Sequence, residues 1–116
     1  MAKHNKLGKD GELVAFMILQ RDGFSVLETN WRFQKAEIDV IAKKDGFLIF
    51  IEVKTRSSKK FGRPEDAIDK KKIALYKDAA EGYLEQYPTE AEIRFDVLSI
   101  IIGKDETQIE HIPNAF

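Results

Sequence analysis

Cysteine is absent from this sequence of 116 residues, and histidine occurs only at His4 and His111. The missing cysteines exclude disulfides and thiolate-bound zinc, and two histidines argue against an imidazole-rich metal site. No apolar stretch approaches the roughly 20 residues that a transmembrane helix needs. The charged amino terminus also lacks the apolar core of a secretory signal, so we expect a cytoplasmic protein.

Charge is distributed unevenly along the chain, although the formal net charge is only −1. Residues 54–72 contain eight basic and three acidic side chains, whereas residues 73–116 contain three basic and nine acidic ones. A basic block of this kind is compatible with nucleic-acid binding. The length and the 43% share of hydrophobic residues fit one soluble domain, which we expect to span residues 1–116.

The hydrophobic patterning predicts seven elements in the order α-β-β-β-α-β-β. Asp45-Gly46 is a strong signal for a two-residue hairpin turn between two apolar runs. The predicted fold class is α/β, with a mixed sheet flanked by helices on both sides. The predicted helices are Leu7–Arg21 and a helix that begins at Gly62–Asp66 and ends near Glu85; the predicted strands are Phe24–Phe33, Glu37–Lys43, Phe47–Lys54, Ile93–Ile102 and Thr107–Ile112.

A two-residue turn at Asp45-Gly46 fixes which residues of the hairpin lie opposite each other. Asp39 then pairs with Glu52, and Glu37 pairs with Lys54, with all four side chains on one face. A bulged three-residue loop would instead turn one strand over. In the predicted register, Ile41 and Phe50 share the charged face, and the opposite face carries Ile38, Val40, Ile49, Ile51 and Val53.

The opposed acids Asp39 and Glu52 point to a cation, because like charges facing each other in a sheet are destabilising. A hard divalent ion, Mg²⁺ or Mn²⁺, would take both carboxylates as ligands, with the backbone carbonyl of Val53 as a further ligand. Lys54 would position or activate the attacking water and offset charge in the transition state. Glu37 either supports this site or tethers Lys54. The alternative is that these charges form only a solvated strand face.

Several short motifs carry a resemblance to known nucleases. The sequence resembles the PD-(D/E)XK nuclease superfamily and, more closely, the YraN-like family of small bacterial proteins. The resemblance implies a restriction-endonuclease-like fold, similar to archaeal Holliday-junction resolvases and tRNA-endonuclease-like domains. It also implies that Glu12, on the first helix, joins the site; otherwise Glu12 is a solvent-facing glutamate. The matching stretches are Gly8–Glu12, Asn30–Arg32, Glu37–Ala42, Phe50–Arg56, Phe61–Pro64 and Arg94–Val97.

Two basic segments follow the hairpin. The predicted loop from Thr55 to Arg63 places four cations beside the proposed site, where they would bind phosphates; the alternative is a solvated loop. These cations are Arg56, Lys59, Lys60 and Arg63. The lysine run at 70–72 is weaker evidence, because lysines on a helix are usually solvated.

The sequence thus predicts a Mg²⁺-dependent endonuclease that acts on DNA, including branched DNA. A non-catalytic nucleic-acid-binding module with the nuclease fold is the main alternative, and a protein-interaction domain is a third. Many enzymes that cut both strands at a symmetric junction are dimers, so a homodimer that pairs through the edge strand 107–112 is a further expectation.

Overall fold

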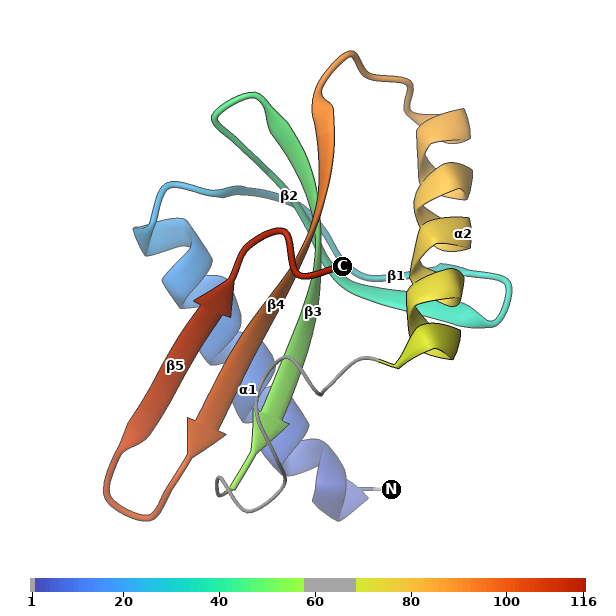
Figure 1. Cartoon of the computed structure of the whole chain (residues 1–116). Coiled ribbons are helices and arrows are strands. Elements are labelled where there is room, and N and C mark those ends of the chain that lie inside the picture. The colour runs from blue at the N-terminus through green and yellow to red at the C-terminus, as the bar shows by residue number, and fades with distance from the viewer. Residues whose placement is uncertain (1, 58–68) are drawn as a thin grey trace.

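The computed structural model describes residues 2–57 and 69–116, with side chains described from Lys9 onward. Its elements follow the predicted order α-β-β-β-α-β-β (Figure 1). In the described residues, no helix combines the length and the apolar composition that a bilayer crossing needs. The elements are α1 (Ala2–Arg21), β1 (Ser25–Phe33), β2 (Ala36–Lys44), β3 (Phe47–Arg56), α2 (Lys70–Gln86), β4 (Glu92–Ile102) and β5 (Thr107–Ile112).

The five strands form one mixed sheet in the order β1-β2-β3-β4-β5. Neighbouring strands are antiparallel except β3 and β4, which are parallel and joined by the crossover that contains α2. In Figure 1, α1 runs behind the sheet, and α2 lies on its other side. The predicted α/β fold class is therefore confirmed. The edge strands are β1 and β5, and pairing through β5 in a homodimer stays a prediction.

Each face of the sheet packs against one helix, which explains why the central strands are apolar on both sides. Ala15 and Leu19 of α1 pack on one face, and Tyr76, Ala79 and Tyr83 of α2 pack on the other. The α1 side of the sheet contributes Val40, Ala42, Ile49, Ile51, Leu98 and Ile100, whereas the α2 side contributes Ile38, Ile41, Leu48 and Phe50.

The β2–β3 hairpin closes through the predicted two-residue turn. Asp45 and Gly46 have positive φ angles of 53° and 84°, as a type I′ turn requires. The strands pair from Lys44–Phe47 to Val40–Ile51, which confirms the predicted register over this stretch.

The pairing of β2 stops at Asp39, and the predicted alternation of faces fails there. Ile38 packs on the α2 side together with Ile41, although it was predicted to lie on the opposite face from Ile41. On β1, the other neighbour of β2, Asn30 lies opposite Asp39 between the regular pairs Thr29–Val40 and Trp31–Ile38. Its backbone has a positive φ of 53°. Asp39 therefore leaves the backbone ladder on both sides. The predicted backbone pairings of Asp39 with Glu52 and of Glu37 with Lys54 are wrong, because β2 and β3 separate after the pair Val40–Ile51.

Two element boundaries also differ from the prediction. Asp69 has an extended backbone and caps α2 by accepting a hydrogen bond from the Lys72 amide at 2.9 Å, so α2 begins at Lys70. The predicted helix start at Gly62–Asp66 lies outside the described residues. Strand β3 continues through Thr55 and Arg56, which pair with β4, so these residues do not belong to the predicted loop.

Candidate functional site

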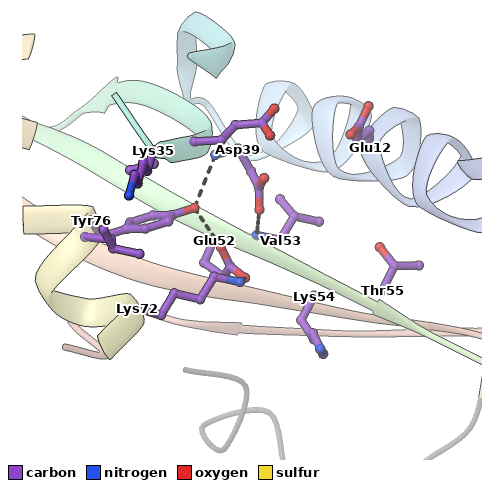
Figure 2. Close-up of a pocket in the computed structure, with 12 residues that line it drawn as sticks. Glu12, Lys35, Asp39, Glu52, Val53, Lys54, Thr55, Lys72 and Tyr76 are labelled. Atoms are coloured by element: carbon purple, nitrogen blue, oxygen red, sulfur yellow. Dashed lines mark hydrogen bonds and ion pairs between the residues drawn. The ribbon is translucent and has the colours of Figure 1, made fainter. Parts of the chain in front are cut away.

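A cavity of about 450 Å³ opens where β2 and β3 separate (Figure 2). It lies between the end of α2 that begins at Lys70 and the side of α1 that carries Glu12. Most of the charged groups predicted for the site lie on its wall. Its ionisable lining residues are Glu12, Lys35, Glu37, Asp39, Glu52, Lys54, Lys72 and Tyr76.

The side chain of Asp39 takes the place of one backbone hydrogen-bond acceptor in the sheet. Its Oδ2 accepts the backbone N–H of Val53 at 2.8 Å, a donor that a regular hairpin would pair with a carbonyl of β2. The N–H and C=O of one strand residue point to the same neighbouring strand. The carbonyl of Val53 is therefore also directed toward the gap beside Asp39, where a third oxygen ligand was predicted.

Glu52 is a buried carboxylate, 3% exposed, with both oxygens engaged by α2. Its Oε1 accepts the hydroxyl of Tyr76 at 2.7 Å, and its Oε2 lies 2.5 Å from the ammonium nitrogen of Lys72. The Lys72 side chain is 44% exposed, so this ion pair sits at the mouth of the cavity. A buried carboxylate without such partners would be strongly destabilising.

The Asp39 and Glu52 carboxyl groups lie close enough together to interact electrostatically. Burial and then the charge of Glu52 raise the pKa of Asp39 to about 8, and the Val53 N–H and the Lys72 charge offset only part of this rise. Without another cation, Asp39 therefore keeps a proton at neutral pH.

Tyr76 holds the two strands in this separated arrangement. The ring is 1% exposed, and its hydroxyl accepts the Asp39 N–H at 3.2 Å while it donates to Glu52 (Figure 2). The same oxygen lies 3.5 Å from the carbonyl of Ile51. Burial, followed by the charges of Asp39 and Glu52, raises the pKa of Tyr76, so the hydroxyl stays neutral and keeps its proton to donate.

Sequence reasoning missed Tyr76 and Lys72 as site residues. No role in the site was predicted for Tyr76, and Lys72 was assigned to a lysine run that was expected to be solvated. The two residues are four positions apart on a helix, so they lie on one face. A buried tyrosine needs a hydrogen-bond partner for its hydroxyl. A tyrosine on the apolar face of a helix, with a lysine four residues before it, is therefore the signal that could have identified Tyr76 and Lys72 as site residues.

The remaining predicted residues occupy different places. Lys54 lines the cavity and makes no ion pair with any residue that the structure describes. Glu37 also lines it, but its Oε1 lies 3.8 Å from Nη2 of Arg32, so its ionic partner is Arg32 and not Lys54. Glu12 is exposed at the rim. Among residues 2–57 and 69–116, no three acids or histidines gather closely enough to form a metal cluster by themselves.

Gly11 determines how closely α1 approaches the site. A Cβ atom at this position would overlap the side chain of Thr55 on β3. Glycine therefore lets the helix lie directly on the strand beside the cavity. This close approach places Glu12, the next residue, on the cavity rim.

The predicted phosphate-binding loop is only partly described. Arg56 is 6% exposed, and its Nη2 donates to Ser99 Oγ at 3.1 Å, so it links β3 to β4 from within the domain. Its predicted place on the loop is wrong, because β3 extends further than the sequence pattern indicates; its phosphate binding stays a prediction. Lys59, Lys60 and Arg63 lie outside the described residues, and their phosphate binding stays a prediction.

Tyr76→Phe should lower the free energy of unfolding by about 1–3 kcal/mol, because it removes one partner of Glu52 and leaves the Asp39 N–H unpaired. Urea denaturation measures this change. Tyr83→Phe is the matched control, since Tyr83 is also buried on α2 but its hydroxyl has no hydrogen-bond partner among the described residues. Equal losses in the two variants would contradict the role given to Tyr76.

Comparison with known proteins places the chain in a family. Residues 11–100 match the Uncharacterised protein family UPF0102. The chain is 48% identical over its whole length to a UPF0102 protein of Flavobacterium psychrophilum, covering 98% of that protein. It is 47% identical to one of Christiangramia forsetii, with 98% covered, and 40% identical to one of Bacteroides fragilis, with 96% covered. The resemblance to the YraN-like family is thereby confirmed, and the chain belongs to the protein family UPF0102.

Proposed function

We propose that this protein binds Mg²⁺ or Mn²⁺ at Asp39 and Glu52 and hydrolyses phosphodiester bonds in nucleic acid, with DNA as the first candidate. The observation that carries the proposal is the contact between two largely buried carboxyl groups in an open cavity, with the pKa of Asp39 raised to about 8. Such perturbed carboxyl pairs in clefts are typical of functional sites.

A second buried acid, Asp96, provides a comparison, because all of its hydrogen-bond partners come from the protein itself. Asp96 is fully buried and accepts two bonds from Arg94 at 2.9 Å and one from the Asn114 amide at 2.9 Å. Its Oδ2 also lies 2.7 Å from Nε2 of His111. Burial alone would raise the pKa of Asp96, but these hydrogen bonds hold it below its ordinary value. For Asp39 the Val53 N–H and the Lys72 charge leave the pKa raised, which supports a cation as an additional partner.

The donors fit a hard divalent cation. Two carboxylates and the carbonyl of Val53 are oxygen ligands, and Mg²⁺ typically takes one or two carboxylates while waters and phosphate oxygens complete its coordination. When bound, such an ion acidifies a water and neutralises charge on the phosphate. In the metal-free protein Lys72 forms the ion pair with Glu52. A bound metal ion would replace Lys72 as the cation beside Glu52 and release the lysine toward the cavity.

The neighbouring side chains have separate tasks in this proposal. Lys54 positions the attacking water and stabilises the negative charge that develops on the phosphate. Lys35 and Lys72 line the same cavity and attract the nucleic-acid backbone. Tyr76 holds Glu52 in place. Glu12 lies on the rim of the same cavity and would join the site from there.

The arrangement also supports kinship with the PD-(D/E)XK nucleases. An aspartate on one strand and a Glu-x-Lys sequence on the next strand meet at one cavity, and a first-helix glutamate lies beside them. This is the arrangement that the resemblance implied for Asp39, Glu52, Lys54 and Glu12. Branched DNA, as in Holliday-junction resolvases, is therefore among the substrates to test.

The test is cleavage of linear, nicked, flapped and four-way DNA with Mg²⁺, with Mn²⁺ and with EDTA. Cleavage should require the metal, and Lys54→Met should slow it by about 10²- to 10³-fold at unchanged thermal stability. Cleavage that persists in EDTA, or that is unchanged in Lys54→Met, would contradict the proposal.

One observation favours a second candidate, a nucleic-acid-binding module without catalysis. The Lys72 ammonium already lies 2.5 Å from Glu52, so this acid has a cationic partner without any metal. Under this alternative, DNA binds at low salt, where phosphate contacts are strongest, and remains uncut with either metal. Neither binding nor cleavage would favour a protein-interaction domain.

A further inference from the structure

A second cavity, of about 470 Å³, opens between α1 and β1 and meets the first one at the proposed metal site. Glu12, Asp39 and Val53 line both cavities. Asp39 stands at the junction because β2 leaves the ladder at this residue. If a ligand places a phosphate at the proposed metal site, the part of the ligand next to that phosphate can therefore enter the second cavity.

The walls of the second cavity combine apolar surface with a few polar groups. Leu13 and Phe16 of α1 form an apolar side and are 61% and 36% exposed. Thr29 and Asn30 of β1 offer a hydroxyl and an amide, and Lys9 adds a positive charge. An aromatic ring, hydrogen-bonding side chains and one cation are the groups that bind a nucleobase and its phosphate.

The position of Asn30 is linked to the metal site. Its backbone has a positive φ of 53° at the point where β1 faces Asp39 between two regular pairs. Asparagine tolerates this conformation better than most residues. Asn30 thus lies beside the interruption at Asp39 and on the wall of the second cavity.

We infer that the second cavity binds one unpaired nucleotide of the nucleic acid whose phosphate is held at Asp39 and Glu52. A volume of about 470 Å³ falls within the range of pockets for small ligands, about 300–1,000 Å³. Inside a duplex the faces of a base are covered by its neighbours, so only an unstacked base can lie against Phe16. This inference rests on the proposed function and narrows its substrate to DNA with an unpaired base.

The test compares two DNA duplexes that differ by a single unpaired nucleotide. Their dissociation constants are measured by fluorescence anisotropy with Mg²⁺ on Lys54→Met protein, which keeps both proposed metal ligands and in which cleavage should be about 10²- to 10³-fold slower. The duplex with the unpaired nucleotide should bind about 5- to 150-fold more tightly, the value of one base–aromatic stack. Phe16→Ala should abolish this preference. Met17→Ala should retain it, because Met17 is 60% exposed on the same helix but does not line the cavity.

Conservative variants separate stacking from simple apolar contact. Phe16→Tyr should keep the preference and Phe16→Leu should lose most of it, while thermal melts confirm that both proteins are folded. Equal binding of the two duplexes, or a preference that survives in Phe16→Ala or Phe16→Leu, would overturn the inference. Failure of the proposed function gives a different result: selective, Phe16-dependent binding with no metal-dependent cleavage by the wild-type protein.

Discussion

Glu52→Gln is expected to reduce metal-dependent cleavage by at least about 100-fold, the scale on which one essential electrostatic contact contributes to a rate. Glutamine keeps the shape of the side chain and a carbonyl that can accept the hydrogen bond of Tyr76. It removes one of the two proposed anionic metal ligands and the ion pair with Lys72. Single-turnover rates at saturating Mg²⁺ measure the effect.

Glu110→Gln is the matched control, because it neutralises an exposed strand glutamate that does not line the site cavity. Its rate should equal that of the wild-type protein. Thermal denaturation of Glu52→Gln excludes unfolding as the cause of lost activity. A folded Glu52→Gln protein that cuts DNA at the wild-type rate would exclude Glu52 from the chemistry.

Mg²⁺ affinity should rise about tenfold per pH unit up to about pH 8 and then level off, because the ion must displace the proton held by Asp39. Isothermal titration calorimetry between pH 6 and pH 9 measures both the affinity and the proton released. Asp39→Asn should bind the ion weakly and lose this pH dependence. An affinity that does not change between pH 6 and pH 8 would contradict the raised pKa of Asp39.

The same pKa predicts how the metal-free protein responds to pH. The pKa of Asp39 is about 8 in the folded chain against an ordinary value of 3.8, so between these values the folded state binds more protons than the unfolded state. The contribution of this group to stability is therefore fully present at low pH and is lost as pH rises through 8. Saturating Mg²⁺ should remove this loss, and Asp39→Asn should not show it.

The hairpin could be predicted from sequence because its determinants are local. Asp45-Gly46 specifies a two-residue turn, and that turn fixes the pairing as far as Val40–Ile51. This register is enough to bring the carboxyl groups of Asp39 and Glu52 together. The order of elements was equally accessible, since it follows from hydrophobic periodicity within each segment.

The other features of the site depend on tertiary contacts. Tyr76 lies 24 residues beyond Glu52, and only the packing of α2 on the sheet brings its hydroxyl between the strands. The predicted partner of Glu37 was wrong because regular alternation does not show that Asp39 accepts the Val53 N–H and so ends the ladder. Arg56 was misplaced because its burial depends on pairing with β4.

The most direct test of the central claim is paramagnetic line broadening by Mn²⁺ in amide NMR spectra. At substoichiometric Mn²⁺, the amide signals of Asp39, Glu52 and Val53 should broaden first in the wild-type protein. In Glu52→Gln, the same addition should leave these three signals sharp. Broadening that instead begins at the acidic turn around Asp105 and Glu106, or that persists at Val53 in Glu52→Gln, would show that the two carboxyl groups do not hold the ion.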